Sequence, residues 1–127
     1  MRYAKHFHKD LYSKRHRDFD GIAMIDLDSV EVCLNKGCWK PLACVETVYD
    51  TGNYFKYTTV TEHVANGLNI PAFLVFYQKG LGSSLFYKIR QVAPFKSRLR
   101  SVSEYVWVSY LRKLQRQHQP YCKHGKK

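Results

Sequence analysis

Two neighbouring stretches in the first half of the chain alternate between hydrophobic and polar residues. Residues 22–34 and 38–49 follow a period of two, which is the period of a β-strand. The segment NKG at 35–37 separates them and is typical of a turn. Pro41 stands near the start of the second stretch, where its missing N–H donor does least harm. The pattern therefore predicts a two-stranded hairpin.

Helical spacing is present at three other places. Apolar residues four apart over 3–11 predict a first helix. Residues 59–62, TVTE, have the spacing of a capping box, and Asn69 can end that helix in a left-handed conformation. Residues 101–104, SVSE, repeat the capping-box spacing and begin a last helix. The apolar stripe of this helix consists of Trp107, Tyr110, Leu111 and Leu114.

Two further strands complete the predicted order. Residues 72–77 are apolar on both parities, as expected of a strand buried on both faces, and residues 85–92 alternate. The order helix, strand, strand, helix, strand, strand, helix predicts an α/β fold with a mixed central sheet flanked by helices. The length of 127 residues suits a single domain over 1–127, with a basic tail over 118–127 that we expect to be mobile.

Charge narrows the class of partner. The chain has 21 Lys and Arg against 10 Asp and Glu, a formal net charge of +11. Such a field attracts polyanions, and nucleic acid is the main polyanion of a cytosol. No apolar run approaches the ~20 residues of a membrane span, and the basic N-terminus lacks the apolar segment of a secretory signal. We therefore expect a cytoplasmic protein that binds nucleic acid and no membrane.

The cysteines, Cys33, Cys38, Cys44 and Cys122, contain no CxxC pair. Cys33 and Cys44 fall inside apolar strand patterns, which favours reduced thiols that pack in the core. A structural zinc site prefers short ligand pairs, but it stays open as an alternative because the chain has six histidines. Four of these lie in basic termini that we expect to be mobile: His6, His8, His118 and His124.

Asp26, Asp28 and Glu46 stand among apolar residues of the predicted hairpin, although carboxylates are seldom buried without a partner. If the turn is centred on the glycine of NKG, residues whose numbers sum to 74 lie opposite each other, so Asp28 faces Glu46. A slip of two residues pairs Asp26 with Glu46 instead. Like charges so placed repel each other, and a hard divalent cation such as Mg²⁺ bound between them is the simplest way to remove this repulsion. The alternative is an ion pair between an aspartate and Arg17 or Arg90.

Four short motifs in the order MIDLDSVEV, KPLACVE, VANGLNIPAFLVFY and SEYVWVSYLRKLQR resemble small phage-type hypothetical proteins of the PD-(D/E)XK, or restriction-endonuclease-like, superfamily. The resemblance covers residues 16–116. It implies a restriction-endonuclease-like core, a nuclease activity, and a metal site in which Asp28 (or Asp26) and Glu46 bind Mg²⁺ or Mn²⁺. It also implies DNA more than RNA as substrate and, for a phage-encoded chain, the cytoplasm of a host cell.

The chain departs from this family pattern at the third motif position. The pattern has a lysine two residues after the glutamate, where it positions the attacking water or balances charge, but here the triplet is Glu46-Thr47-Val48. Lys40 shares the face of the glutamate but lies about 20 Å away along the strand. Lys56, ahead of the next helix, is the replacement that we favour, and Lys88 on a neighbouring strand is the other.

Two classes of function stay open. One is a divalent-metal-dependent nuclease that cleaves phosphodiester bonds of DNA, with Asp28, Glu46 and Lys56 as catalytic residues. The other is a catalytically inactive nuclease fold that binds nucleic acid or inhibits a host protein. Basic side chains can contact phosphates in either case, and duplex cutting would suit a homodimer. The candidates for nucleic-acid binding are His16, Arg17, Lys88, Arg98, Arg100, Arg112, Lys113 and Arg116.

Overall fold

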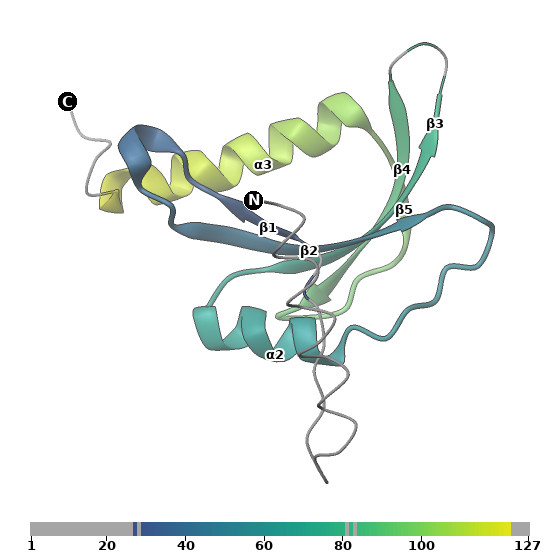
Figure 1. Cartoon of the computed structure of the whole chain (residues 1–127), viewed down its shortest axis with the longest axis horizontal. Helices are drawn as coiled ribbons and strands as arrows, with labels where there is room; N and C mark the ends of the chain where they lie inside the picture. Colours follow the sequence, from purple (N-terminus) through teal and green to yellow (C-terminus); the bar gives the residue numbers. More distant parts are fainter. Residues whose placement is uncertain (1–26, 28, 81, 83, 123–127) are drawn as a thin grey trace, which may run out of the picture.

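The computed structural model describes residues 27, 29–80, 82 and 84–122. Within them, five strands form one sheet in the order β1-β2-β3-β4-β5, and two α-helices pack against it (Figure 1). The strands are β1 (Ser29–Val32), β2 (Pro41–Tyr49), β3 (Ala72–Lys79), β4 (Leu85–Ala93) and β5 (Arg100–Ser103). The helices are α2 (Thr59–Leu68) and α3 (Glu104–His118), with short 3₁₀ helices η1 (Asn35–Gly37) and η2 (Gln119–Tyr121).

The sheet combines both kinds of strand pairing. β2 runs parallel to β3, and the other three neighbouring pairs are antiparallel. The parallel pair is joined through α2, because strands that run in the same direction need a long connection. The predicted α/β fold with a mixed sheet and helices is confirmed, but β5 was not expected. Its residues are mostly exposed and show no apolar alternation, so pairing with β4 is what defines this strand.

The register of the hairpin agrees with the one expected from its turn. Ser29 pairs with Val45 and Glu31 with Ala43, and the numbers of both pairs sum to 74. A bulge follows between Glu31 and Val32, so the register holds on the side of the hairpin away from the turn. The helix expected over 3–11 lies outside the described residues. So do four of the predicted site residues: His16, Arg17, Asp26 and Asp28.

Alternation along the inner strands divides the core into two layers. Cys44 of β2 and Leu74 of β3 lie in the layer under α2, which contributes Ala65. Val45, the next residue of β2, lies on the other face together with Trp107 of α3. The two helices therefore cover opposite faces of the sheet (Figure 1). The apolar stripe predicted for the last helix packs in this second layer: Trp107, Tyr110, Leu111 and Leu114.

The ends of α2 follow local chemistry with one correction. Asn69 ends the helix in the left-handed conformation at φ 58°, as expected. The N-cap is Thr58, one residue before the expected Thr59, and its hydroxyl donates to the carboxylate of Glu62 at 2.6 Å. Thr58 lies four residues before Glu62 and its side chain makes no capping hydrogen bond, so the three-residue spacing of a capping box pointed to the wrong threonine.

The last helix begins later than expected. Its N-cap is Ser103, whose hydroxyl accepts a hydrogen bond from the backbone N–H of Val106, rather than Ser101. Ser101 instead belongs to β5 and pairs with Lys88 of β4. Neither helix in the described ranges has the length and apolar composition that a membrane crossing requires.

Candidate functional site

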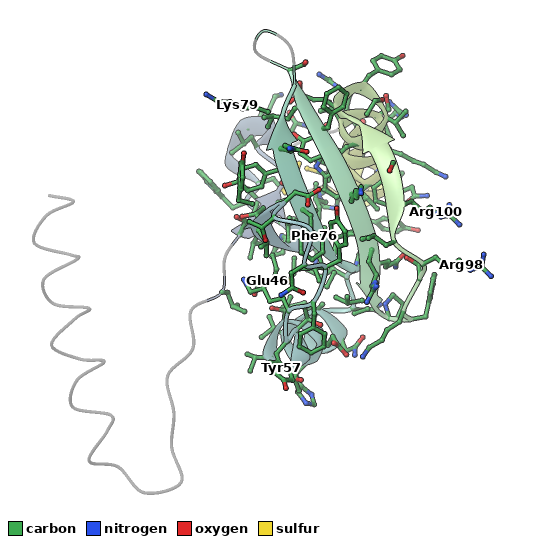
Figure 2. All side chains as sticks on the ribbon, turned by 90° about the vertical axis from the view of Figure 1, so that its right-hand side faces the viewer. Glu46, Tyr57, Phe76, Lys79, Arg98 and Arg100 are labelled. Carbon is green, nitrogen blue, oxygen red and sulfur yellow. The ribbon has the colours of Figure 1, made fainter. Side chains whose placement is uncertain are left out.

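A buried carboxylate lies on the α2 face of the sheet. Glu46 is 6% exposed, and strand alternation aligns it with Cys44 and Val48 of the layer under α2. Val48, two residues after Glu46, packs against the apolar residues of that layer. Figure 2 shows Glu46 and Phe76 on the face of the sheet turned toward the viewer. Burying an unpaired ionised group is costly, so the partners of Glu46 decide what the site can do.

Both carboxylate oxygens of Glu46 have a protein partner. Thr61, buried in α2, donates its hydroxyl to Oε1 at 2.5 Å, and Lys56 donates its ammonium to Oε2 at 3.2 Å. The Glu46 side chain is 8% exposed and that of Lys56 39%, so the ion pair reaches from the core to the surface. The loop over 50–58 thus brings to the carboxylate the lysine that sequence analysis favoured. Each carboxylate oxygen has a second lone pair that can accept a further interaction.

The other two lysines considered lie away from this carboxylate. Lys40 is exposed and precedes β2. Lys88 donates to the hydroxyl of Tyr54 at 2.8 Å and lies 4.6 Å from the centroid of its ring, and Tyr54 donates in turn to Asp50 at 3.1 Å. The hydrogen bond with Tyr54 is the main cause that raises the pKa of Lys88. Lys88 is therefore a cation of the same sheet face with a partner of its own.

An arginine lies on the same row of the sheet as the carboxylate. Glu46 pairs with Leu74 of β3, and Leu74 pairs with Arg90 of β4. Two strand spacings separate the two charged residues, about 10 Å. The Nε of Arg90 is buried and has no hydrogen-bond partner in the described part of the chain. A buried N–H without a partner is costly, so this guanidinium is well suited to an anion.

A hollow of about 310 Å³ opens farther along the same face. Phe86 pairs with Gln78 and Ser101 with Lys88, so these side chains share the parity of Glu46. The lining of the hollow comes from three strands and the end of β2: Asp50, Gln78, Phe86, Tyr87, Lys88, Ser101, Val102 and Ser103. We refer to the surface with Glu46, Lys56, Arg90, Lys88 and this hollow as the open sheet face.

Six of the residues predicted to bind nucleic acid belong to the described part of the chain, and they fall on two sides of it. Arg98 and Arg100 lie at the β5 edge, which Figure 2 shows beside the face that carries Glu46. Lys88 belongs to the open sheet face itself. The remaining three are exposed on the helix that covers the opposite face: Arg112, Lys113 and Arg116. The structure therefore groups the first three near one face and separates them from the helix residues.

Four metal-ligating side chains gather at the tip of the hairpin. Their ligand atoms all lie within 4.8 Å of one another, and they belong to Cys33, Cys38, His118 and Cys122. The Sγ of Cys38 is 3.4 Å from the Nε2 of His118, although the two residues are 80 positions apart. This Cys/His cluster could hold a metal ion. It differs from the expected Mg²⁺ site, because thiolate and imidazole ligands select softer ions than carboxylates do.

Sequence analysis favoured packing thiols and left a zinc site open as the alternative, without predicting this set of ligands. His118, assigned to a mobile terminus, is the last residue of α3, and Cys122, just after η2, is 3% exposed. The signal that was present is spacing: four residues separate Cys33 from Cys38, and three separate His118 from Cys122. Both spacings lie in the range of ligand pairs in zinc sites, although neither is a CxxC motif.

The pKa is raised both at Cys38 of the cluster and at the fourth cysteine, for partly different reasons. A backbone hydrogen bond from Lys40 lowers the pKa of Cys38, but burial and the neighbouring thiols of the cluster outweigh it, so the pKa of Cys38 is raised. Crowded thiols resist ionising together unless a cation lies between them. Cys44 lies apart in the layer under α2, where burial and then the charge of Glu46 raise its pKa. It is a packing thiol, as expected.

Carboxylates and the Cys/His cluster are the two kinds of candidate metal ligand in the chain. Of the expected carboxylate site only Glu46 belongs to the described residues. Among these residues the Cys/His cluster is the only gathering of three or more possible ligands. Comparison of the chain with protein-family models, with curated proteins and with solved structures returns no match.

Proposed function

We propose that the chain is a divalent-metal-dependent nuclease that cleaves phosphodiester bonds of DNA. The observation that carries this proposal is the Glu46–Lys56 pair, in which a buried carboxylate and an ammonium meet at 3.2 Å. Such a nuclease needs a carboxylate that binds the metal and a cation that balances charge at the attacking water. Lys56 supplies the second group from a loop, in place of the motif position that Val48 occupies.

A restriction-endonuclease-like core is part of the proposal. A hairpin, a crossover helix and a parallel strand follow one another as β1, β2, α2 and β3, and the carboxylate stands in the second strand of the hairpin. The register of Ser29 with Val45 is the one from which the pairing of Asp28 with Glu46 was predicted. Glu46, with Asp28 or Asp26, would hold the ion.

Three residues around Glu46 have a role in this scheme. A bound Mg²⁺ or Mn²⁺ supplies a Lewis acid for the phosphate and an acidified water. Thr61 fixes the rotamer of Glu46 through its hydrogen bond to Oε1, and Lys56 holds positive charge at Oε2. Arg90, with its buried and unpartnered Nε, is placed to bind a phosphate oxygen on the same row.

Exposed aromatic side chains lie in the loop that carries Lys56. Phe55 is 63% and Tyr57 82% exposed, and their rings pack edge to face with centroids 4.9 Å apart. Aromatic rings so exposed provide stacking surfaces for unpaired bases. Together with the net charge of +11, they support DNA as the polyanion that meets this face.

A second function is favoured by one specific observation. Both oxygens of Glu46 are hydrogen-bonded by the protein itself, and Val48 is part of the core, so the pair is satisfied without a metal ion. This arrangement suits an inactive nuclease fold that binds nucleic acid or inhibits a host protein.

Incubation of plasmid and single-stranded DNA with the full chain in Mg²⁺ or Mn²⁺ separates the two functions. Under the nuclease proposal, wild-type protein cleaves only with metal, Glu46→Gln removes the cleavage, and the control Glu31→Gln on β1 retains it. Binding without cleavage in the wild type supports the second function. If affinity for DNA does not fall steeply between about 50 and 200 mM salt, the protein does not bind DNA through phosphate contacts, and both DNA cleavage and nucleic-acid binding in this way are refuted.

A further inference from the structure

The Cys/His cluster joins two parts of the chain that are far apart in sequence. Cys33 and Cys38 lie on either side of η1 at the tip of the hairpin, and His118 and Cys122 enclose η2 at the end of α3. Figure 1 shows the hairpin tip beside the C-terminal end of α3. Two ligands from each side give the cluster four potential donors.

The dimensions of the cluster match a tetrahedral site. Zinc binds thiolate at about 2.3 Å and imidazole at about 2.0–2.1 Å, which gives tetrahedral edges of about 3.8 Å between sulfurs and about 3.6 Å between sulfur and nitrogen. Sγ of Cys38 and Nε2 of His118 are 3.4 Å apart, and no pair of ligand atoms in the cluster exceeds 4.8 Å. Small side-chain adjustments therefore suffice to surround one ion.

We propose that Cys33, Cys38, His118 and Cys122 form a structural Zn²⁺ site. Three thiolates and one imidazole are a ligand set that zinc prefers and that Mg²⁺ and Ca²⁺ do not. Four protein ligands fill a tetrahedral ion, so the site is closed and has no position for a water or a substrate. The proposal does not depend on nuclease activity.

The backbone between Cys33 and Cys38 has an unusual conformation that brings the two thiols together. Lys36 and Trp39 both have left-handed backbone conformations, at φ 49° and φ 59°, which non-glycine residues adopt rarely. Backbone hydrogen bonds from Trp39 N–H to the carbonyl of Cys33, at 2.7 Å, and from Cys33 N–H to that of Lys40, at 2.9 Å, close the turn. The turn directs two thiols toward the end of α3, and a bound ion would compensate for the strained backbone.

Several large apolar side chains at this end of the molecule are exposed. Leu34 is 63%, Trp39 64% and Tyr121 82% exposed, and the buried residue of α3 is Trp107, in the half of the helix farther from the cluster. The ion would therefore be a main tether between the hairpin tip and the end of α3.

Metal analysis of the full chain tests the proposal directly. Protein purified under reducing conditions without chelators should contain one zinc per chain by elemental analysis and native mass spectrometry. Co²⁺ exchanged into the site should show the intense visible absorption of a tetrahedral thiolate complex. A zinc-selective chelator should lower the Tm by on the order of 10 °C, with recovery on adding Zn²⁺ but not Mg²⁺.

Variants distinguish these ligands from an ordinary cysteine. Cys38→Ser and His118→Asn should each lose bound zinc, whereas the control Cys44→Ala, which removes a buried thiol outside the cluster, should keep it. If the ligand variants do not fold, the wild-type metal content and Co²⁺ spectrum decide. Zinc-free protein that neither binds Co²⁺ tetrahedrally nor changes its Tm with Zn²⁺ would overturn the proposal, as would zinc retained by Cys38→Ser.

Discussion

Replacing Lys56 by methionine removes the ammonium from Glu46 while it keeps the length of the side chain. The carboxylate then stays 6% exposed with the Thr61 hydroxyl as its remaining partner. Breaking a fully buried pair costs about 3–5 kcal/mol, but Lys56 is 39% exposed and water screens it. The cost should lie between that of a buried pair and that of an exposed pair. We expect the free energy of unfolding to fall by about 1–2 kcal/mol, which corresponds to a fall in Tm of about 4–8 °C for a chain of this length.

A double-mutant cycle with Glu46→Gln assigns this loss to the pair. Because a neutral glutamine needs no cation, Lys56→Met in the Glu46→Gln background should cost close to zero, which leaves a coupling free energy of about 1–2 kcal/mol. Urea unfolding monitored by tryptophan fluorescence supplies the four free energies. The control Lys113→Met removes an exposed charge on α3 and accounts for the relief of charge repulsion in a chain of net charge +11.

The same variant tests the catalytic role of Lys56. If its ammonium balances charge at the attacking water, metal-dependent cleavage should fall by about 100-fold or more in Lys56→Met, with DNA affinity nearly unchanged. Equal losses of stability in the wild-type and Glu46→Gln backgrounds would show that the ion pair contributes nothing. Cleavage that persists at wild-type rate would refute the role in catalysis while leaving the structural pair intact.

Two further outcomes follow from the core. Trp107→Ala removes a ring that stacks on Tyr110 and packs edge to face on Phe73, and it should cost about 3–5 kcal/mol in urea unfolding, whereas a loss below 1 kcal/mol would contradict the packing. Burial and Glu46 raise the pKa of Cys44 above its ordinary 9.0, so this thiol contributes stability that is present below pH 9.0 and lost as pH rises through the folded pKa. Compared with Cys44→Ala, wild-type protein should therefore lose stability above pH 9.0, and parallel stability curves for the two would refute the shift.

The hairpin and the parity of its register were accessible from the sequence because local features indicate both. The turn at 35–37 and the period of two in the flanking residues left two registers open, and Ser29 pairs with Val45 as in the one centred on the glycine of the turn. The same holds for the end of α2, where Asn69 tolerates a left-handed backbone. The two-faced burial of β3 followed from its continuous apolar run.

The features that were missed depend on tertiary contacts. β5 is short and exposed, so only its pairing with β4 makes it a strand. The approach of Lys56 to Glu46 was the favoured option because Lys56 precedes the next helix, but only the fold of residues 50–58 decides between it and Lys88. The Cys/His cluster required the end of α3 to meet the hairpin tip, and an apolar stripe shows which face of a helix packs without showing what its end approaches.

The two candidate metal sites lie at different parts of the hairpin and differ in chemistry, so one can depend on the other without the reverse being true. The Cys/His cluster adjoins the turn of the hairpin, and Glu46 stands five residues beyond the start of β2, about 17 Å along the strand. A zinc ion at the turn would hold the register that sets Glu46, so its removal would impair the carboxylate site through the hairpin. Changes at Glu46 or Lys56 alter no zinc ligand and would leave that ion in place. We therefore expect a Glu46 variant without cleavage activity to keep its bound zinc. We also expect the wild-type protein to lose cleavage when zinc is removed, because the soft and hard ligands belong to separate sites.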